Sequence, residues 1–258
     1  MIDKPRAKPA SRRRTPRAIV GAGLLLLPAA AQTQSYSYST YGTVGLIDMP
    51  TAQSAEDAEL AATFSTFANT TRSTLSFQIT PRLSGSFRYS KIEDFGAGGG
   101  DLFDRSFDLR YRFVDETNTR PAIAIGLQDF IGTGVYSGEY VVATKNFSPR
   151  LSFTGGIGWG RLGSYNGFSN PLGAIDDQFE TRPDRDFGRG GEIEATGWFR
   201  GDAALFGGIA WQATDKLTLK AEYSSDAYGI ESRNNSFEHK SPFNFGLDYE
   251  VRDNIHLQ

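Results

Sequence analysis

The chain of 258 residues has no cysteine and only two histidines, His239 and His256. A disulfide framework and a lipid-modified N-terminal cysteine are therefore excluded. A metal site built from His and Cys ligands is excluded as well, and we predict neither a metal nor a cofactor. No Gly-x-Ser-x-Gly motif accompanies His239. We therefore predict no catalytic residue and a protein that is not an enzyme.

Long apolar runs are also scarce. The apolar stretch 18–27 follows a basic run at 4–17 and precedes Pro28-Ala29-Ala30-Ala31. This layout predicts a cleaved secretory signal peptide over residues 1–31, because a spanning helix needs roughly 20 apolar residues. No later segment is apolar enough to cross a bilayer as a helix. A closed barrel is then the remaining way for this chain to cross lipid.

Positive charge is sparse once the signal peptide is removed. Residues 32–258 hold 20 Lys and Arg against 29 Asp and Glu. A nucleic-acid partner requires a basic face, so we predict that this chain does not bind nucleic acid.

Alternation of apolar and polar residues is what the sequence has in abundance. It begins at residue 59, and each alternating segment has about the ten residues that a tilted strand needs to cross a hydrocarbon layer. The predicted strands are 59–68, 73–80, 83–92, 105–114, 121–130, 138–147, 151–160, 203–213, 217–226 and 242–252, and an eleventh begins at Ile255.

The connections between these strands differ in length at the two ends. Tight corners at 80–83, 148–151, 214–217 and 252–255 and a short connection at 115–120 alternate with mostly long connections at 93–104, 131–137, 161–202 and 227–241. The short connection 69–72 is the exception. Outer-membrane barrels have short periplasmic turns and long outer loops. We predict an all-β, antiparallel up-and-down transmembrane barrel over residues 59–258, incomplete at its C-terminus. A periplasmic β-sandwich is the alternative.

The charged residues of the strands are predicted to line the interior of this barrel. There they would pair across neighbouring strands, or contact a hydrated glycan. These candidate ligand-binding residues are Arg88, Asp108, Arg110, Arg112, Glu139, Lys145, Lys220, Glu222, Asp248 and Glu250. Paired carboxylates such as Asp108 with Glu139, or Asp248 with Glu250, leave open the alternative of an enzyme that modifies a polysaccharide.

Glycine and aromatic residues refine the picture of the strands. Gly156, Gly158 and Gly160 would leave one strand face bare for a close neighbour. Aromatic residues lie near strand ends, as in the interfacial belts of membrane barrels. Phe113, Phe147, Phe153, Trp211 and Tyr249 lie near the short turns, and Tyr89, Trp159 and Tyr223 lie toward the opposite ends.

Four segments of the sequence form a distinctive set. They are Tyr41-Gly42-Thr43-Val44-Gly45-Leu46-Ile47-Asp48-Met49-Pro50-Thr51-Ala52, the run 105–112, the run 120–134 and the run 136–145. These segments resemble the YjbH family of outer-membrane proteins. The resemblance is dense over about residues 41–147 and looser to residue 258. The first of these segments belongs to a stretch, 32–58, that is either a plug at the periplasmic mouth or an ordinary lead-in to the first strand.

The resemblance implies a role in exopolysaccharide or capsule biosynthesis or export. It implies a bacterial outer-membrane location, with surface polysaccharide, outer-membrane lipid and periplasmic polysaccharide-export components as partners. Family members are longer than this chain, which agrees with an unfinished last strand. The resemblance supplies no catalytic residue.

Overall fold

The computed structural model describes residues 36–95, 99–184, 192–193 and 195–258. All of these belong to one unit, residues 33–258. The predicted signal peptide and residues 32–35 lie outside the described residues.

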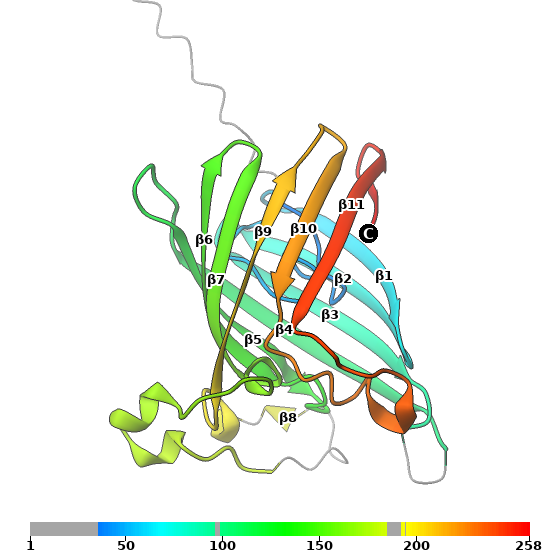
Figure 1. The fold of residues 1–258 in the computed structure, drawn as a ribbon, viewed down its shortest axis with the longest axis vertical. Helices are drawn as coiled ribbons and strands as arrows, with labels where there is room; N and C mark the ends of the chain where they lie inside the picture. Colours follow the sequence, from blue (N-terminus) through cyan, green and yellow to red (C-terminus); the bar gives the residue numbers. More distant parts are fainter. Residues whose placement is uncertain (1–35, 96–98, 185–191, 194) are drawn as a thin grey trace, which may run out of the picture. The chain divides into compact units, whose positions relative to one another are not determined.

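The described chain forms one antiparallel sheet, drawn in Figure 1. The path through the sheet is β1-β2-β3-β4-β5-β6-β7-β9-β10-β11-β12, and β8 pairs with β5 beside this path. The strands are β1 (Leu60–Phe67), β2 (Thr70–Thr80), β3 (Leu83–Ile92), β4 (Leu102–Val114), β5 (Ala122–Gly132), β6 (Gly138–Ser148), β7 (Leu151–Gly160), β8 (Glu192–Ile193), β9 (Ala203–Gln212), β10 (Leu217–Tyr223), β11 (Phe243–Arg252) and β12 (Ile255–Leu257).

Short 3-10 helices occupy the loops between some of these strands. They are η1 (Arg161–Gly163), η2 (Pro171–Ala174), η3 (Asp177–Phe179), η4 (Ala195–Gly197) and η5 (Arg233–Asn235). None of the helices in the described part of the chain is long and apolar enough to span a membrane.

The all-β, antiparallel prediction is confirmed, and the predicted strands agree with the observed ones to within a few residues. Two details differ. The strand predicted to reach residue 226 ends at Tyr223, where the Ser224 amide donates to the Pro242 carbonyl outside the sheet. The two-residue strand β8 was not predicted. The sandwich alternative is wrong, because the described strands form one continuous sheet with no second sheet packed on it.

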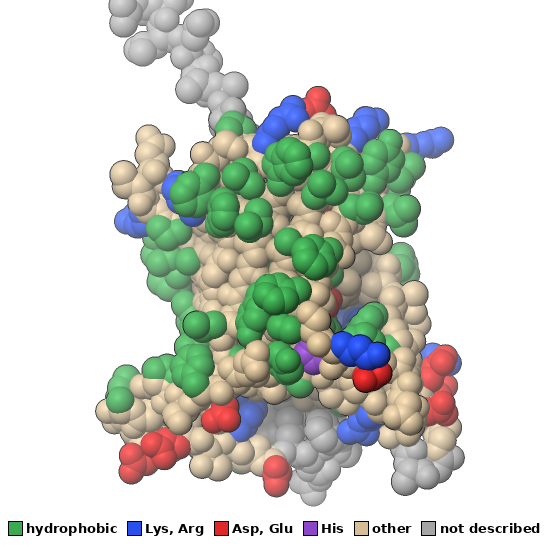
Figure 2. Space-filling model, in the orientation of Figure 1, with side chains coloured by type: hydrophobic (Ala, Val, Ile, Leu, Met, Phe, Trp, Pro, Cys, Tyr) green, Lys and Arg blue, Asp and Glu red, His purple; other side chains and the backbone are tan. Residues whose placement is uncertain are grey.

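The two faces of the sheet have opposite polarity. In β2 the side chains of Leu75, Phe77 and Ile79 are exposed, whereas Ser76 and Gln78 are buried. We call the face with the buried polar residues the inner face and the other the outer face. Figure 2 shows hydrophobic side chains gathered on the visible outer face, with most charged side chains toward its two ends. This arrangement reverses that of a water-soluble sheet, whose apolar face is buried.

The tight corners lie at one end of the sheet, which we call the short-turn end. Hydroxyl side chains organise two of these corners. Thr80 Oγ1 accepts a hydrogen bond from the Leu83 amide at 3.0 Å, and Thr214 Oγ1 accepts one from the Leu217 amide at 3.0 Å. A Thr side chain that bonds the backbone in this way stabilises a tight reversal. The opposite end carries the loops 161–202 and 224–242, and we call it the long-loop end.

The glycines of β7 allow close packing on the inner face, as predicted. A Cβ atom at Gly156 would lie 2.3 Å from the ring of Phe206 in β9, and one at Gly158 would lie 2.5 Å from Leu162. Trp159 corrects the prediction for the long-loop aromatic belt, because it is only 3% exposed. Its indole N–H donates to Asn170 Oδ1 at 3.0 Å, so loop 161–202 covers it. The five aromatics near the short turns are exposed, as an interfacial belt requires.

The sheet has two edges, β1 and β12, which do not pair with each other among the described strands. The described strands therefore form an open sheet, and the barrel, which we predict to be incomplete in this chain, stays a prediction. The inner face nevertheless curls around residues 36–58, which we call the N-terminal segment (Figure 1).

We expect Gly156→Ala to destabilise the fold by about 1–3 kcal/mol, because the new methyl group overpacks against Phe206. Denaturant unfolding followed by tryptophan fluorescence measures this loss. Gly155→Ala is the matched control, since a Cβ atom there meets nothing within 4 Å. That variant should be unchanged or more stable by up to about 1 kcal/mol. Equal destabilisation of the two variants would contradict the packing explanation.

Candidate functional site

The N-terminal segment folds on itself before it meets the sheet. Isolated bridges join Tyr38 to Val44 and Gly45 to Pro50. Gly42 lies in the turn between Tyr38 and Val44, and its φ of 75° is a conformation that favours glycine. A methyl group at Gly42 would also lie 2.4 Å from Thr74 of β2, so the segment packs directly on the inner face.

A single carboxylate holds the tip of the segment. Glu222 Oε2, on β10, accepts hydrogen bonds from the backbone amides of Ile47 at 2.9 Å, Asp48 at 3.0 Å and Met49 at 2.9 Å. Glu222 Oε1 also accepts from Asn244 Nδ2 at 3.1 Å. Converging amides of this kind form a nest for an anion, and they compensate the cost of burying the carboxylate.

Further polar contacts fix the segment on both sides of this tip. Lys220 Nζ donates to the Leu46 carbonyl at 3.0 Å, and Arg110 donates to the Thr51 carbonyl at 3.1 Å. The Ala52 amide donates to Thr144 Oγ1 at 2.9 Å. These three side chains come from β10, β4 and β6, so the segment joins strands that are far apart in the sheet.

A small apolar cluster completes this part of the interior. Its buried members are Met49, Ala52, Ala122, Ala124, Tyr140, Val142, Leu162 and Phe206. The cluster places the apolar side chains of the segment against the inner faces of β5, β6 and β9. The interior is therefore held by hydrogen bonds between the backbone of the segment and polar side chains, together with this cluster and a second apolar cluster of Tyr41, Ile92, Val135 and Tyr136.

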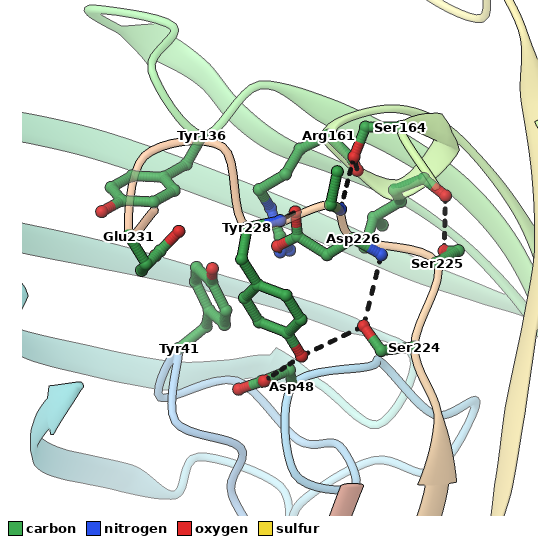
Figure 3. Close-up of polar contacts among 12 residues, drawn as sticks. Tyr41, Asp48, Tyr136, Arg161, Ser164, Ser224, Ser225, Asp226, Tyr228 and Glu231 are labelled. Carbon is green, nitrogen blue, oxygen red and sulfur yellow. Dashed lines mark hydrogen bonds and ion pairs between the residues drawn. The ribbon is translucent and has the colours of Figure 1, made fainter. Parts of the chain in front are cut away.

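Tyr41 lies at the centre of a second cluster, toward the long-loop end. Three guanidinium groups approach its ring, with distances from Cζ to the ring centroid of 4.1 Å for Arg161, 4.4 Å for Arg72 and 5.3 Å for Arg88. The ring of Tyr136 packs edge-on against it at 5.7 Å. Figure 3 shows Tyr41 close to Arg161 and Tyr136. Cation–π contacts are strongest when they are shielded from water, as they are here.

Each of the three guanidinium groups has its own carboxylate partner. Arg72 pairs with Glu231, Arg161 pairs with Asp226, and Arg88 pairs with Asp108 at 2.9 Å. Two of these carboxylates, Asp226 and Glu231, belong to loop 224–242. This loop therefore supplies the negative charge that two buried arginines, Arg72 of β2 and Arg161 of η1, require.

Loop 224–242 also bonds the N-terminal segment directly, as Figure 3 shows. The Tyr228 hydroxyl lies 2.7 Å from Asp48 Oδ2 and 3.1 Å from Ser224 Oγ. Burial raises the pKa of the Tyr228 hydroxyl, and the Asp48 carboxylate raises it further. Burial also raises the pKa of Glu231, against the opposing effect of Arg72.

Eight of the ten predicted interior residues lie on the inner face. They are Arg88, Asp108, Arg110, Arg112, Lys220, Glu222, Asp248 and Glu250. The structure brings Arg88 together with Asp108, and Lys220 together with Asp248 at 3.7 Å. Arg112 and Glu250 are half-buried near the short-turn end. Whether any of them binds a ligand stays a prediction.

The predicted interior placement is wrong for Glu139 and Lys145, because they lie on the outer face of β6. Val142 and Thr144 contact the N-terminal segment, so strand alternation turns residues 139 and 145 the other way. Glu139 is buried because loop 161–202 covers it. Its carboxylate accepts hydrogen bonds from Arg182 at 2.8 and 3.0 Å and from the Phe199 amide at 2.9 Å.

Lys145 pairs with Glu116 in the turn after β4, at 2.7 Å. The proposed carboxylate pair of Asp108 with Glu139 is also wrong, because the sheet lies between the two side chains. The two carboxylates therefore cannot act together on one glycosidic bond.

One small cavity lies where the segment meets the sheet. It has a volume of about 20 Å³ and lies between Tyr38 and Val44 of the segment and Ser86, Arg110 and Tyr140 of the strands. This volume accommodates about one water molecule. Among the described residues, no group of three His, Cys, Asp or Glu side chains is arranged to hold a metal ion.

Sequence reasoning missed five residues of the Tyr41 cluster. They are Tyr41, Arg72, Arg161, Asp226 and Glu231. Arg72 had a usable signal, since it lies two and four residues before the inner-face residues Thr74 and Ser76. The predicted strand began one residue too late to include it. Asp226 also had a signal, since it ends the predicted strand 217–226 in phase with Lys220 and Glu222. The other three lie outside the predicted strands and have no periodic pattern.

Comparison with known proteins supports the family relation. A family model described as "YjbH: Exopolysaccharide biosynthesis protein YbjH" matches residues 37–258. The chain belongs to this YjbH family of exopolysaccharide biosynthesis proteins.

A relative from Escherichia coli (strain K12), "Uncharacterized lipoprotein YjbH", is 36% identical over 187 residues. The match covers 69% of this chain and 26% of the relative, so the chain spans about a quarter of the relative's length.

We expect Glu222→Gln to loosen the tip of the N-terminal segment by about 1.5–3 kcal/mol. The amide removes the negative charge and turns an NH₂ group toward the amides that the carboxylate bonded. Hydrogen exchange at the amides of Ile47, Asp48 and Met49 measures the effect and should accelerate. Glu250→Gln is the control on the same face. Unchanged exchange in Glu222→Gln would show that the carboxylate does not hold the segment.

We expect Tyr41→Leu to destabilise the protein by about 2–4 kcal/mol, because the three arginines lose the aromatic ring that they share. Tyr41→Phe keeps the ring and should cost less than about 1 kcal/mol. Urea unfolding of the two variants compares them directly. Equal losses would assign the role to the hydroxyl group instead.

Proposed function

We propose that this chain forms part of an outer-membrane β-barrel that acts in the biosynthesis or export of a surface exopolysaccharide. The observation that carries this proposal is the reversed polarity of the sheet. Apolar side chains are exposed on the outer face, and charged side chains are buried on the inner face. Lipid is the solvent in which this distribution is favourable.

The outer face supports placement in lipid. Large apolar residues are exposed along most of the strands, including Phe64 of β1 at 81% and Phe245 of β11 at 79%. Monomeric proteins in water rarely expose apolar patches that extend over a whole sheet. The exposed aromatic residues near the short turns fit the interfacial belt of such a protein.

The inner face supports a contact with a hydrated glycan. Its side chains already bind carbonyl and amide groups of the N-terminal segment. Sugar hydroxyls offer the same donors and acceptors, so a polysaccharide could take the place of the segment. We propose that the N-terminal segment is a plug that keeps the polar interior closed until it is displaced.

The family description supports the pathway, and the name of the E. coli relative supports association with a membrane. The present chain has no cysteine. In our proposal its own strands provide the membrane attachment.

We propose a binding or conducting role without catalysis. Of the two carboxylate pairs considered, Asp108 and Glu139 are separated by the sheet. Asp248 is engaged by Lys220 at 3.7 Å and by His256 at 2.8 Å. Its oxygens therefore already have cationic or hydrogen-bonding partners.

The test is outer-membrane fractionation combined with a substitution on the outer face. Ile209→Arg in β9 should reduce the amount of folded protein in the outer membrane, because an arginine that faces lipid costs from about 1 kcal/mol near the interfaces to about 2–4 kcal/mol at the midplane. Gel mobility before and after boiling measures the folded fraction. The yield of surface polysaccharide should fall with it.

Ile175→Arg is the matched control, since Ile175 is 78% exposed in loop 161–202 and lies outside the strands. It should leave both readouts unchanged. Recovery of the wild-type protein in the aqueous fraction, or tolerance of Ile209→Arg, would contradict the membrane placement. Normal polysaccharide yield in cells that lack the protein would contradict the pathway.

A further inference from the structure

We infer that the free edge of β1 pairs with an antiparallel strand from sequence outside the described strands. That strand is one of an odd number of additional strands, and it does not come from a second copy of this chain. The inference rests on the proposed placement of the sheet in the outer membrane.

The edge of β1 is built to continue the sheet. All eight residues of β1 pair with β2 on one side, and none pairs with a described strand on the other side. Leu60 and Phe64 are 69% and 81% exposed on the outer face. An edge of unpaired amides and carbonyls is not tolerated in lipid, so a membrane sheet must cover it.

The topology fixes the direction of the missing partner. Neighbours along the path from β1 to β12 are antiparallel, so the strand direction reverses at every step. The path has eleven strands, counting β1 to β7 and β9 to β12. The two edge strands, β1 and β12, therefore run in the same direction. Antiparallel closure between them requires an odd number of strands in between.

A second copy cannot supply these strands. Copies that share one orientation in the membrane keep their strand directions, because rotation about the membrane normal does not reverse a strand. Pairing of β1 with β1, of β12 with β12, or of β1 with β12 would be parallel in every case. Bacterial single-chain outer-membrane barrels have an even number of strands that all pair antiparallel, so a parallel closure does not fit this class.

Direct pairing of β1 with β11 would have the correct direction, but the interior contents lie between them. Ser65 Oγ of β1 donates to the Thr40 carbonyl of the N-terminal segment at 2.6 Å. On the other side, Ile47 of the same segment approaches Gly246 of β11. Near the long-loop end, the ring of Phe67 packs 4.9 Å from that of Phe237 in loop 224–242. These contacts bridge the two edges without joining them.

The chemistry of the partner follows from both faces of β1. Its outward side chains must be apolar to continue the exposed Leu60 and Phe64. Its inward side chains must be small or polar to face Ala61, Thr63 and Ser65. In the E. coli relative, the matched region is 26% of the length. A family member of that length has ample further sequence from which to supply such strands.

Photocrosslinking in the outer membrane tests this inference. A benzoyl-phenylalanine residue replaces Ala62 or Thr66, two exposed outer-face positions of β1, in the protein as the cell makes it. We expect each probe to crosslink to a period-two segment that is not part of β1 to β12, located by peptide mass spectrometry. Moving the probe four residues toward the C-terminus should move the crosslinked residue about four toward the N-terminus of its strand. This reversal is the signature of antiparallel pairing.

A probe at Leu75 of β2 is the matched control, because both of its neighbouring strands belong to this chain. It should give only crosslinks to β1 and β3. Crosslinks of the β1 probes to β11, to β12 or to a second copy would overturn the inference, and so would the absence of any protein crosslink. Failure of the protein to reach the outer membrane would instead overturn the proposed function, which fractionation of the same cells reports separately.

Discussion

Glu222 accepts backbone hydrogen bonds from three successive residues, Ile47, Asp48 and Met49, and the organisation of the interior depends on this contact. This sheet turns its charged face inward, so only small apolar clusters lie in its interior. Buried polar groups must each find a partner, or the cost of desolvation destabilises the fold. The N-terminal segment supplies those partners from its own backbone. Its carbonyls bind Lys220, Arg110 and Arg88, and its amides bind Glu222 and Thr144.

The buried positive charges of the Tyr41 cluster also need partners. Three guanidinium groups around one ring would repel one another without compensation. Glu231 and Asp226 of loop 224–242 and Asp108 of β4 neutralise them. Loop 224–242 therefore has a structural role in the interior, although its length alone predicts a solvent-exposed outer loop. Loop 161–202 also has a structural role, on the outer face of β6, where Arg182 anchors it to the buried Glu139.

The strands could be predicted from sequence because alternation is a local property, and every strand of the sheet's path carries it. The inner-face positions could be predicted wherever apolar residues clearly marked the opposite face of a strand, as in β3, β4, β10 and β11. The prediction failed in β6, where Tyr140, Val142 and Thr144 face inward although two of them are apolar. There the N-terminal segment offers an apolar contact on the inner face. Apolar residues of β6 therefore face inward, and the charged residues Glu139 and Lys145 face outward. The cluster around Tyr41 could not be predicted, since tertiary contacts alone bring its loop residues together.

The N-terminal segment lies far in the sequence from the residues that it bonds, and this separation affects the order in which the chain assembles. Ile47 and Glu222 are separated by 175 residues, and Asp48 and Tyr228 by 180. The segment that is synthesised first thus gains its main partners only after β10 and the following loop are made. Contacts of such long range form slowly, because the entropy of closing the intervening chain is lost before the bonds are gained. Until then the polar interior is open to water, so the seal between segment and sheet is among the last features to form.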